Sequence, residues 1–507
     1  MSPGPSLWPG PGETRSEREC YLMNIQSKQS ALAAIEDHTQ VITAIADRIW
    51  SYAETSLQEY QSCALYVEEC RKAGFTVEEN YCGIPTAFAA SYGSGRPHIG
   101  ILAEYDALSG LSQRAGSIHQ EECIPGGNGH GCGHNLLGAG SFAAALGIKA
   151  YLQEHPGCGT LTLYGCPGEE GWASKAYMAR EHIWDNLDAA FCWHPEDCNE
   201  VVTGSSNACL QYLYKFTGLA SHASGAPEKG RSALDAVELM NIGVQFLREH
   251  MGTKARIHYA MIDTGGSSPN VVQPHASVLY YIRENHITDC MELKNRVDRI
   301  AQGAALMTDT TMEKVFIDGL ADSITNRTLE DVLYDNFNAL GVPSYTEEEL
   351  RFTDQLAATY TDSLNGPRAI PGLGSSVDED YAEEVRQLQS QSDHSMNDFL
   401  LPHFRGSVFR PGSTDVGDVS WNTPTAQIHV AAWPNGEAGH SWQNVSCVAT
   451  SVGHKAALHA GRVMACAAID LFESPAILEK AREEWKRRTH GSYICPFPPE
   501  AKPEIKL

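Results

Sequence analysis

Short apolar runs of strand length alternate along this chain with longer segments in which apolar residues recur every three or four positions. The runs at residues 99–103, 161–164, 187–193 and 426–433 are each bounded by polar residues, as buried strands are. Between the first two runs, residues 135–154 show a helical pattern rich in Ala and Gly, small residues that allow close packing on a sheet. This alternation predicts an α/β fold with a mainly parallel sheet covered by helices on both faces.

The pattern changes near residue 208. From there the chain predicts a β-α-β-β-α-β order, which forms a complete, ferredoxin-like small domain by itself. The six elements fall at residues 210–217, 232–251, 255–263, 276–284, 290–306 and 312–317. Because the first pattern resumes afterwards, we predict a domain at residues 208–319 inserted between two parts of the catalytic domain, 19–207 and 320–507, after a disordered tail at residues 1–18.

The segment 345–410 is acidic, long and only weakly periodic. Such a segment either shapes the entrance of a site or lies on the surface without a role in it. The pattern slightly favours the second interpretation.

Acidic or metal-capable side chains follow each of the four apolar runs. In chain order they are Glu104 and Asp106, Glu169 and Glu170, His194, and His440. A further segment, Gly-His-Gly-Cys-Gly-His at residues 129–134, places Cys132 and His134 two positions apart between flexible glycines. Sites in open α/β sheets form outside the carboxyl ends of the strands. The sequence therefore predicts that these side chains converge on one site.

Thiolate, imidazole and carboxylate groups are ligands for zinc, manganese and cobalt, and a thiolate can bridge two cations as a carboxylate does. We therefore predict two divalent metal ions (Zn, Mn or Co) per chain. The predicted ligands are Cys132, His134, Glu170, His194 and His440. Paired cations polarise a carbonyl and activate water, which is the chemistry of amide hydrolysis. Since adjacent side chains diverge, Glu169 is predicted to be the general base beside Glu170, and Asp106 to orient a metal-bound histidine.

Plainer interpretations exist for each residue. A Glu-Glu pair is usually a solvated charge on the surface. Taken alone, Cys132 would be a buried thiol and His194 a core histidine. Asp106 could equally well be a turn residue at the end of a strand. A glycine-rich turn can cradle phosphate, but no Gly-Lys-Ser/Thr follows this one. The repeated position after apolar strands favours the site. His429 lies inside an apolar run and is interpreted as structural, whereas His130 is left outside the metal set.

Composition narrows the class of protein. The 507 residues suffice for two or three domains, and a net charge of −26 argues against nucleic acid or an anionic membrane surface as a partner. Fifteen cysteines, an odd number without disulfide spacing, indicate free thiols in a reducing compartment. Without an apolar signal segment or a run of 18 apolar residues, we expect no membrane span and a cytoplasmic protein.

Several motifs together bring a family into view. They lie at residues 103–108, 129–137, 167–171, 221–223, 230–236 and 268–274. With these motifs the chain resembles the di-metal aminoacylase/carboxypeptidase metallopeptidase family, in its amidohydrolase branch, over about residues 25–480. Two departures accompany the resemblance. Asn135 stands where many relatives have Asp, and Trp442 stands where smaller residues are common.

The resemblance implies roles for residues that the pattern alone leaves unassigned. It supports the five predicted ligands and Glu169 as the base. It also implies that the inserted domain is a lid through which a homodimer forms, with His222 reaching the partner subunit's active site to stabilise the oxyanion. Asn270 and Arg283 fall on positions that hold substrate, Arg283 through a carboxylate, and Gly412 falls on a loop that lines the substrate.

The predicted function is hydrolysis of an amide bond in an N-acyl amino acid, a p-aminobenzoyl-glutamate-like compound or a dipeptide. One alternative is a pathway-specific amidase or peptidase that acts on a specialised metabolite. An alternative of another class is a non-catalytic, metal-stabilised subunit of a heteromer. The presence of Glu169 and all five predicted ligands favours the enzyme.

Overall fold

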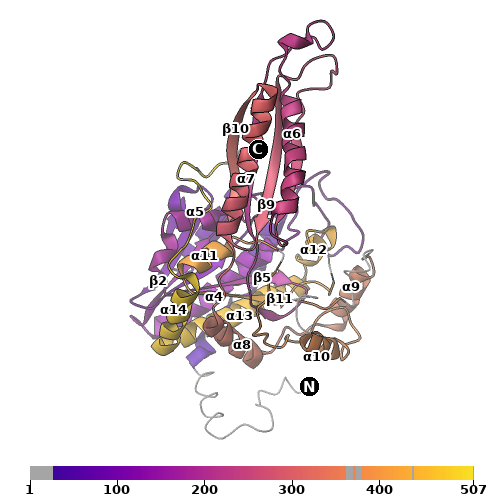
Figure 1. Ribbon diagram of the computed structural model, residues 1–507. Coiled ribbons are helices and arrows are strands. Elements are labelled where there is room, and N and C mark those ends of the chain that lie inside the picture. The colour runs from indigo at the N-terminus through magenta and orange to yellow at the C-terminus, as the bar shows by residue number, and fades with distance from the viewer. Residues whose placement is uncertain (1–26, 361–368, 373–378, 411, 437–438, 506–507) are drawn as a thin grey trace.

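The computed structural model describes residues 27–360, 369–372, 379–410, 412–436 and 439–505, so the predicted tail at residues 1–18 lies outside the described residues. It contains one seven-stranded sheet and one four-stranded sheet. Figure 1 shows the smaller sheet, with α6 and α7, standing upright on the larger unit. The predicted fold class is confirmed: a mainly parallel α/β unit carries a separate antiparallel α+β unit.

The large sheet has the strand order β1-β2-β4-β3-β5-β11-β6. Its strands are β1 (Thr76–Glu79), β2 (Phe88–Ser94), β3 (His98–Ala103), β4 (Gly159–Gly165), β5 (Ala189–Glu196), β6 (Glu200–Val202) and β11 (Thr425–Ala431). The four central strands, β4, β3, β5 and β11, are parallel, and the three outer ones pair antiparallel. All four central strands therefore end at the same edge, where the predicted site residues follow them.

Helices cover the large sheet, and the longest are the most apolar. Their bounds are α2 (Thr39–Tyr52), α3 (Tyr60–Lys72), α4 (His134–Glu154), α5 (Ser174–Arg180), α8 (Arg327–Leu340), α9 (Glu347–Ala357), α10 (Glu379–Gln389), α11 (Val416–Asn422), α12 (Trp442–Cys447), α13 (Ser451–Glu473) and α14 (Pro475–Thr489). Small residues let α4 and α13 approach closely: a Cβ at Gly461 would lie 2.6 Å from that of Ala143. The Ala- and Gly-rich pattern of residues 135–154 is thus explained by packing.

The smaller sheet has the order β10-β7-β9-β8 and is antiparallel throughout. Its elements are β7 (Ala208–Thr217), α6 (Ala233–Leu247), β8 (Arg256–Asp263), β9 (His275–Glu284), α7 (Ile287–Thr308) and β10 (Thr311–Leu320). They follow the predicted β-α-β-β-α-β order and enclose a core of their own. Ala208 and Glu284 pair at the end of the sheet near the large unit, where Asn207 N–H donates to the Gly412 carbonyl. Thr217 and His275 pair at the opposite end, which we call the distal end.

Two further features bear on the class of protein. The cysteines of the described ranges are all free thiols, as their spacing predicted. Within the same ranges, no helix combines the length and the apolar composition needed to cross a lipid bilayer.

Candidate metal centre

A glycine turn brings Cys132 and His134 to the sheet edge. His134 is the first residue of α4, and Gly133 before it has φ +77°, the left-handed conformation that suits glycine. A Cβ there would lie 2.7 Å from Pro195 Cγ and 3.2 Å from the Trp433 ring. The turn can therefore approach the end of β5 this closely only with glycine at residue 133.

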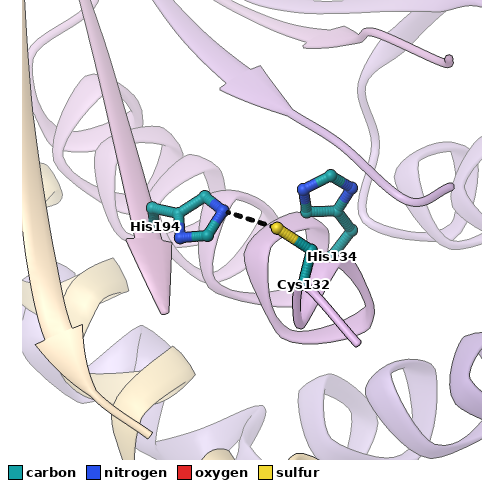
Figure 2. Close-up of side chains that lie close together, drawn as sticks. All are labelled: Cys132, His134 and His194. Atoms are coloured by element: carbon teal, nitrogen blue, oxygen red, sulfur yellow. Dashed lines mark hydrogen bonds between the residues drawn. The ribbon is translucent and has the colours of Figure 1, made fainter. Parts of the chain in front are cut away.

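The predicted ligands form two sets that share one atom. Ligand atoms of Cys132, His134 and His194 lie within 4.8 Å of one another, and so do those of Cys132, Glu170 and His440. In Figure 2 the thiol lies between the two imidazoles, with Cys132 Sγ 3.3 Å from His194 Nε2. Two three-residue sets with a common sulfur match the donor sets of two neighbouring cations bridged by a thiolate.

Hydrogen bonds fix Nδ1 of both His134 and His194, so that Nε2 of each ring faces the Cys132 thiol. His134 Nδ1 donates to Asp106 Oδ1 over 2.9 Å, and His194 Nδ1 donates to the Pro195 carbonyl over 2.6 Å. His134 Nε2 and Glu170 Oε1 are buried without a hydrogen-bond partner among the described residues. Buried polar atoms are rarely left unpaired in proteins, so these two fit a missing ligand. The residues present therefore fit a pair of cations.

Asp106 connects both donor sets. Its Oδ1 takes the His134 hydrogen bond, while Oδ2 accepts from Ser56 Oγ at 3.0 Å and from the Glu170 backbone N–H at 2.9 Å. Burial disfavours the charged carboxylate, but His134 nevertheless holds the pKa of Asp106 below its ordinary value. The structure thus places Asp106 behind the candidate ligands.

Glu169 and His440 lie at the open side of the site. Both line a cavity next to the candidate ligands, and the Glu169 carboxylate lies close to His134 and Glu104. Burial raises the pKa of Glu169 well above its ordinary value, and the neighbouring carboxylates Glu104 and Glu170 raise it further. His440 has φ +50°, its side chain is 55% exposed, and its Nε2 lies 3.5 Å from Glu170 Oε1. All five predicted ligands and Glu169 therefore come together.

A buried lysine next to this site was not predicted. Lys175 Nζ lies 2.7 Å from Glu104 Oε1 and 2.6 Å from Asp415 Oδ1, and all three side chains are buried. Burial acts to lower the pKa of Lys175, but the two carboxylates raise it, so the ammonium stays charged. The other oxygen of Glu104 lies 3.3 Å from His134 Nε2. Lys175 therefore links the candidate ligands to the loop that carries Asp415.

A cavity of about 410 Å³ opens from the site and includes Gly412 in its wall. Gly372 and Arg410 also line it, so the segment 345–410 does help to shape the site. The slight preference for a surface role was wrong. Arg410 reaches Glu200 over 2.9 Å, a pairing across 210 positions that weak local periodicity cannot reveal.

Three predicted residues of the inserted unit lie apart from the ligands within one chain. His222 and Asn270 are exposed and adjoin each other, because His222 bridges Val271 and Ala223 N–H donates to the Asn270 carbonyl. They follow the distal end of β7 and precede that of β9. Arg283 lies at the opposite end of the sheet, paired with Cys209 in the strand register and stacked 4.3 Å over the Tyr281 ring.

His429 belongs to another group of metal-capable residues. Its Nδ1 lies 2.8 Å from Glu200 Oε1, with Cys198 nearby, but Arg410 already pairs with the same carboxylate. The positive charge of the Arg410 guanidinium would repel a metal ion at this position, so we interpret His429 as structural, as its strand pattern indicated. His130 is also structural: it is buried, and its Nε2 lies 3.0 Å from the Ile49 carbonyl.

Comparisons with known proteins first define the class. Residues 208–307 match a family profile described as a peptidase dimerisation domain, M20_dimer. A solved Bacillus subtilis protein, titled a dinuclear metal binding peptidase from the M20 family, shares the fold with a TM-score of 0.53 and 15% identity. The alignment covers 86% of this chain and 99% of that one.

The relatives then identify the family. The chain is 42% identical over 473 residues to one subunit of the p-aminobenzoyl-glutamate hydrolase of Escherichia coli, covering 93% of this chain and 97% of that protein. It is 26% identical over 487 residues to the Xaa-Arg dipeptidase of Mus musculus, covering 93% and 94%. The chain belongs to the M20 peptidase family and is a hydrolase acting on amide bonds. The resemblance predicted from the sequence motifs is thereby confirmed.

Proposed function

We propose that this chain is a di-metal amidohydrolase that cleaves an N-acyl amino acid, a p-aminobenzoyl-glutamate-like compound or a dipeptide. The observation that carries the proposal is the shared thiol: Cys132 belongs to both donor sets, at the mouth of a cavity that holds Glu169. The relatives named as a p-aminobenzoyl-glutamate hydrolase subunit and a dipeptidase support this reaction class.

In the proposed mechanism, two divalent cations (Zn, Mn or Co) would be held by Cys132, His134, Glu170, His194 and His440. Such a pair, when bound, polarises the substrate carbonyl and acidifies water. Glu169 accepts the proton of the attacking water and returns it to the nitrogen of the leaving amine. Asp106 fixes the tautomer of His134 by accepting from Nδ1, which leaves Nε2 free to bind.

A second copy of the chain completes the proposed site. His222 lies beyond the distal end of β7, whose ten residues span roughly 30 Å at about 3.3 Å per residue. Its own lid therefore holds His222 away from the cavity, whereas a partner's lid can bring it in to stabilise the oxyanion. We assign Asn270 to the same partner-derived group, and Arg283 and Gly412 to substrate contacts, Arg283 through a carboxylate.

The edge strand β8 is the proposed dimer contact. It ends the four-stranded sheet, and three of its apolar side chains are exposed. These are Tyr259 at 43%, Met261 at 38% and Ile262 at 51%. An edge strand with exposed apolar residues is a template for pairing with another strand. Pairing between two lids through β8 would bury this surface.

The test is amide cleavage by the purified chain after metal loading, followed by mass spectrometry. The substrates are p-aminobenzoyl-glutamate, β-alanyl dipeptides and N-acyl amino acids. Glu169→Gln retains the size of the side chain and all five ligands, so it is expected to bind two metals per chain and to lose at least about a hundredfold in kcat. Cleavage by chelated protein, or full activity of Glu169→Gln, would contradict the proposal.

The Escherichia coli relative is named as one subunit of its hydrolase, which gives a reason to test for a required partner. If the chain binds two metals per molecule but cleaves none of the substrates, the second candidate function, a subunit of a heteromer, gains support. Size-exclusion chromatography with light scattering, before the activity assay, distinguishes a self-sufficient homodimer from an inactive lone subunit.

A further inference from the structure

A buried carboxylate lines the cavity away from the candidate ligands. Glu330 lies in the first turn of α8, is 3% exposed and contributes to the cavity wall. Within the described part of the chain, no Lys, Arg or His nitrogen comes within 4.0 Å of its carboxylate oxygens, and the nearby Thr203 hydroxyl is buried without a hydrogen-bond partner. Buried carboxylates are normally paired, so an unpaired one in a cavity points to a ligand.

Two arginines lie near Glu330, but neither comes within 4.0 Å of its carboxylate oxygens. Arg488 Nε pairs with Glu484 Oε1 at 2.9 Å, and Arg327 Nη2 donates to the Gly406 carbonyl at 3.3 Å. Burial raises the pKa of Glu330 to about 7, although the charges of Arg327 and Arg488 act to lower it. Among the described residues this buried carboxylate therefore has no direct ion pair.

Neighbouring hydroxyls add further acceptors to the same wall. Ser205 Oγ donates to the Ser323 carbonyl at 2.9 Å, and Thr325 Oγ1 donates to the Gly204 carbonyl at 3.0 Å. Each hydroxyl has a single hydrogen, so these bonds leave only oxygen lone pairs to offer a ligand. Ser205, Thr325 and Glu330 together form what we call the acceptor wall.

Arg410 also lines the cavity, but its positive charge does not compensate the hydrogen-bond acceptors of the acceptor wall. Arg410 Nη2 donates to Glu200 Oε1 at 2.9 Å, and Nε donates to the Thr203 carbonyl at 3.4 Å. Burial acts to raise the pKa of Glu200, but Arg410 and His429 lower it to about 2, so the guanidinium is neutralised by an ionised carboxylate. The half-buried Glu196 adds another carboxylate to the lining. The cavity away from the candidate ligands therefore favours hydrogen-bond donors and positive charge.

We infer that the acceptor wall is a subsite for a primary amino group of the substrate, anchored by the Glu330 carboxylate. The inference rests on the proposed amidohydrolase function and narrows its substrate class. With the substrate carboxylate assigned to Arg283 of the lid, the amino group belongs to the acyl portion, which enters the catalytic unit. An aromatic amine and an alkyl ammonium share the required chemistry, because both donate hydrogen bonds to oxygen.

Matched substrate pairs test the subsite. One pair is p-aminobenzoyl-glutamate and benzoyl-glutamate, and the other is a β-alanyl dipeptide and its propionyl analogue. The wild-type protein should favour each amino member by roughly 10- to 100-fold in kcat/KM, the usual effect of a hydrogen bond to a charged group. Glu330→Gln should reduce this preference to less than about threefold, mainly through KM. The pair with the larger preference identifies the kind of amine.

Asp335→Asn is the matched control, because Asp335 is an exposed carboxylate on the same helix outside the cavity lining. It should retain the full preference. The inference would be overturned if the wild-type protein had the same kcat/KM for both substrates of a pair, or if Glu330→Gln lowered kcat/KM equally for both. If no amide is cleaved at all, the proposed function fails separately. Calorimetric binding of p-aminobenzoate against benzoate, with wild-type protein and Glu330→Gln, then decides on the subsite alone.

Discussion

Replacing Asp106 with Asn changes one atom at the point where both donor sets are held. The native carboxylate is buried and accepts three hydrogen bonds, from His134 Nδ1, Ser56 Oγ and the Glu170 N–H. Asparagine has the same shape but turns one oxygen into an N–H₂ group. Hence Asp106→Asn tests the hydrogen bonding without opening a cavity.

Either orientation of the new amide has a cost. If its nitrogen faces His134, the ring must accept at Nδ1, and the proton moves to Nε2, the atom that faces Cys132 in the shared donor set. If its nitrogen faces Glu170, a buried backbone N–H loses its acceptor, which costs about 1–3 kcal/mol. Loss of such supporting bonds typically lowers metal affinity about 10- to 100-fold, and we expect that range for Asp106→Asn.

The assay is a zinc titration against a fluorescent chelator, combined with thermal unfolding of the metal-free and metal-loaded protein. Ser56→Ala is the control, because it removes one donor to Asp106 and leaves the His134 and Glu170 bonds in place. It should change affinity by less than about threefold. A zinc affinity for Asp106→Asn within about twofold of the wild-type value would refute the role assigned to this carboxylate.

Three further predictions concern charge and assembly. Lys175→Met leaves two buried carboxylates without their cation and should lower the free energy of unfolding by about 3–5 kcal/mol, measured by urea denaturation. Met261→Lys places a charge on the exposed edge strand and should convert the proposed dimer to a monomer of much lower activity, measured by light scattering and substrate cleavage. Burial raises the pKa of Asp418 to about 8. The folded state thus binds this proton more tightly than the unfolded state does. The contribution of Asp418 to the free energy of unfolding is therefore at its maximum below about pH 4 and is lost as the pH rises to about 8.

Each of these predictions has a matched comparison. Lys175→Arg keeps the charge and should lose less stability than Lys175→Met; equal losses would indicate packing rather than pairing. Leu306→Lys introduces the same charge at an exposed position of α7 and should leave the proposed dimer intact. Asp418→Asn should flatten the decline in unfolding free energy between about pH 5 and 7 by up to about 1.4 kcal/mol per pH unit. An unchanged slope would show that Asp418 does not carry that proton.

Local patterns were sufficient to predict the sheet edge at which the candidate ligands meet. The apolar runs ending near Ala103, Gly165 and Glu196 are parallel central strands, so the polar residues that follow them had to emerge at one edge. The prediction that Cys132 and His194 converge needed only this rule and a glycine turn. The inserted unit was equally predictable, because its strand and helix periods change sharply along the chain.

Long-range pairing was not predictable from the same patterns. Lys175 lies in a short helix and looks like a solvated charge, yet it is fully buried against Asp415, 240 positions away. Glu200 and Arg410 pair in the same way across 210 positions. Glu330 shows only the usual acidic preference of a first helical turn. Burial decides the meaning of all these charges, and burial depends on the complete fold.

The charges around the candidate ligands also connect metal binding to folding. Burial and Glu170 raise the pKa of the Cys132 thiol, and burial together with Glu104 and Glu170 raises that of Glu169. The buried ammonium of Lys175 lies beside these residues, but it pairs with the carboxylates of Glu104 and Asp415 and not with the Cys132 thiol. Gathering so many acidic groups out of water is unfavourable unless positive charge accompanies them. Two divalent cations would supply that charge, and because they bind the assembled donors far better than an unfolded chain, their binding energy would become folding energy.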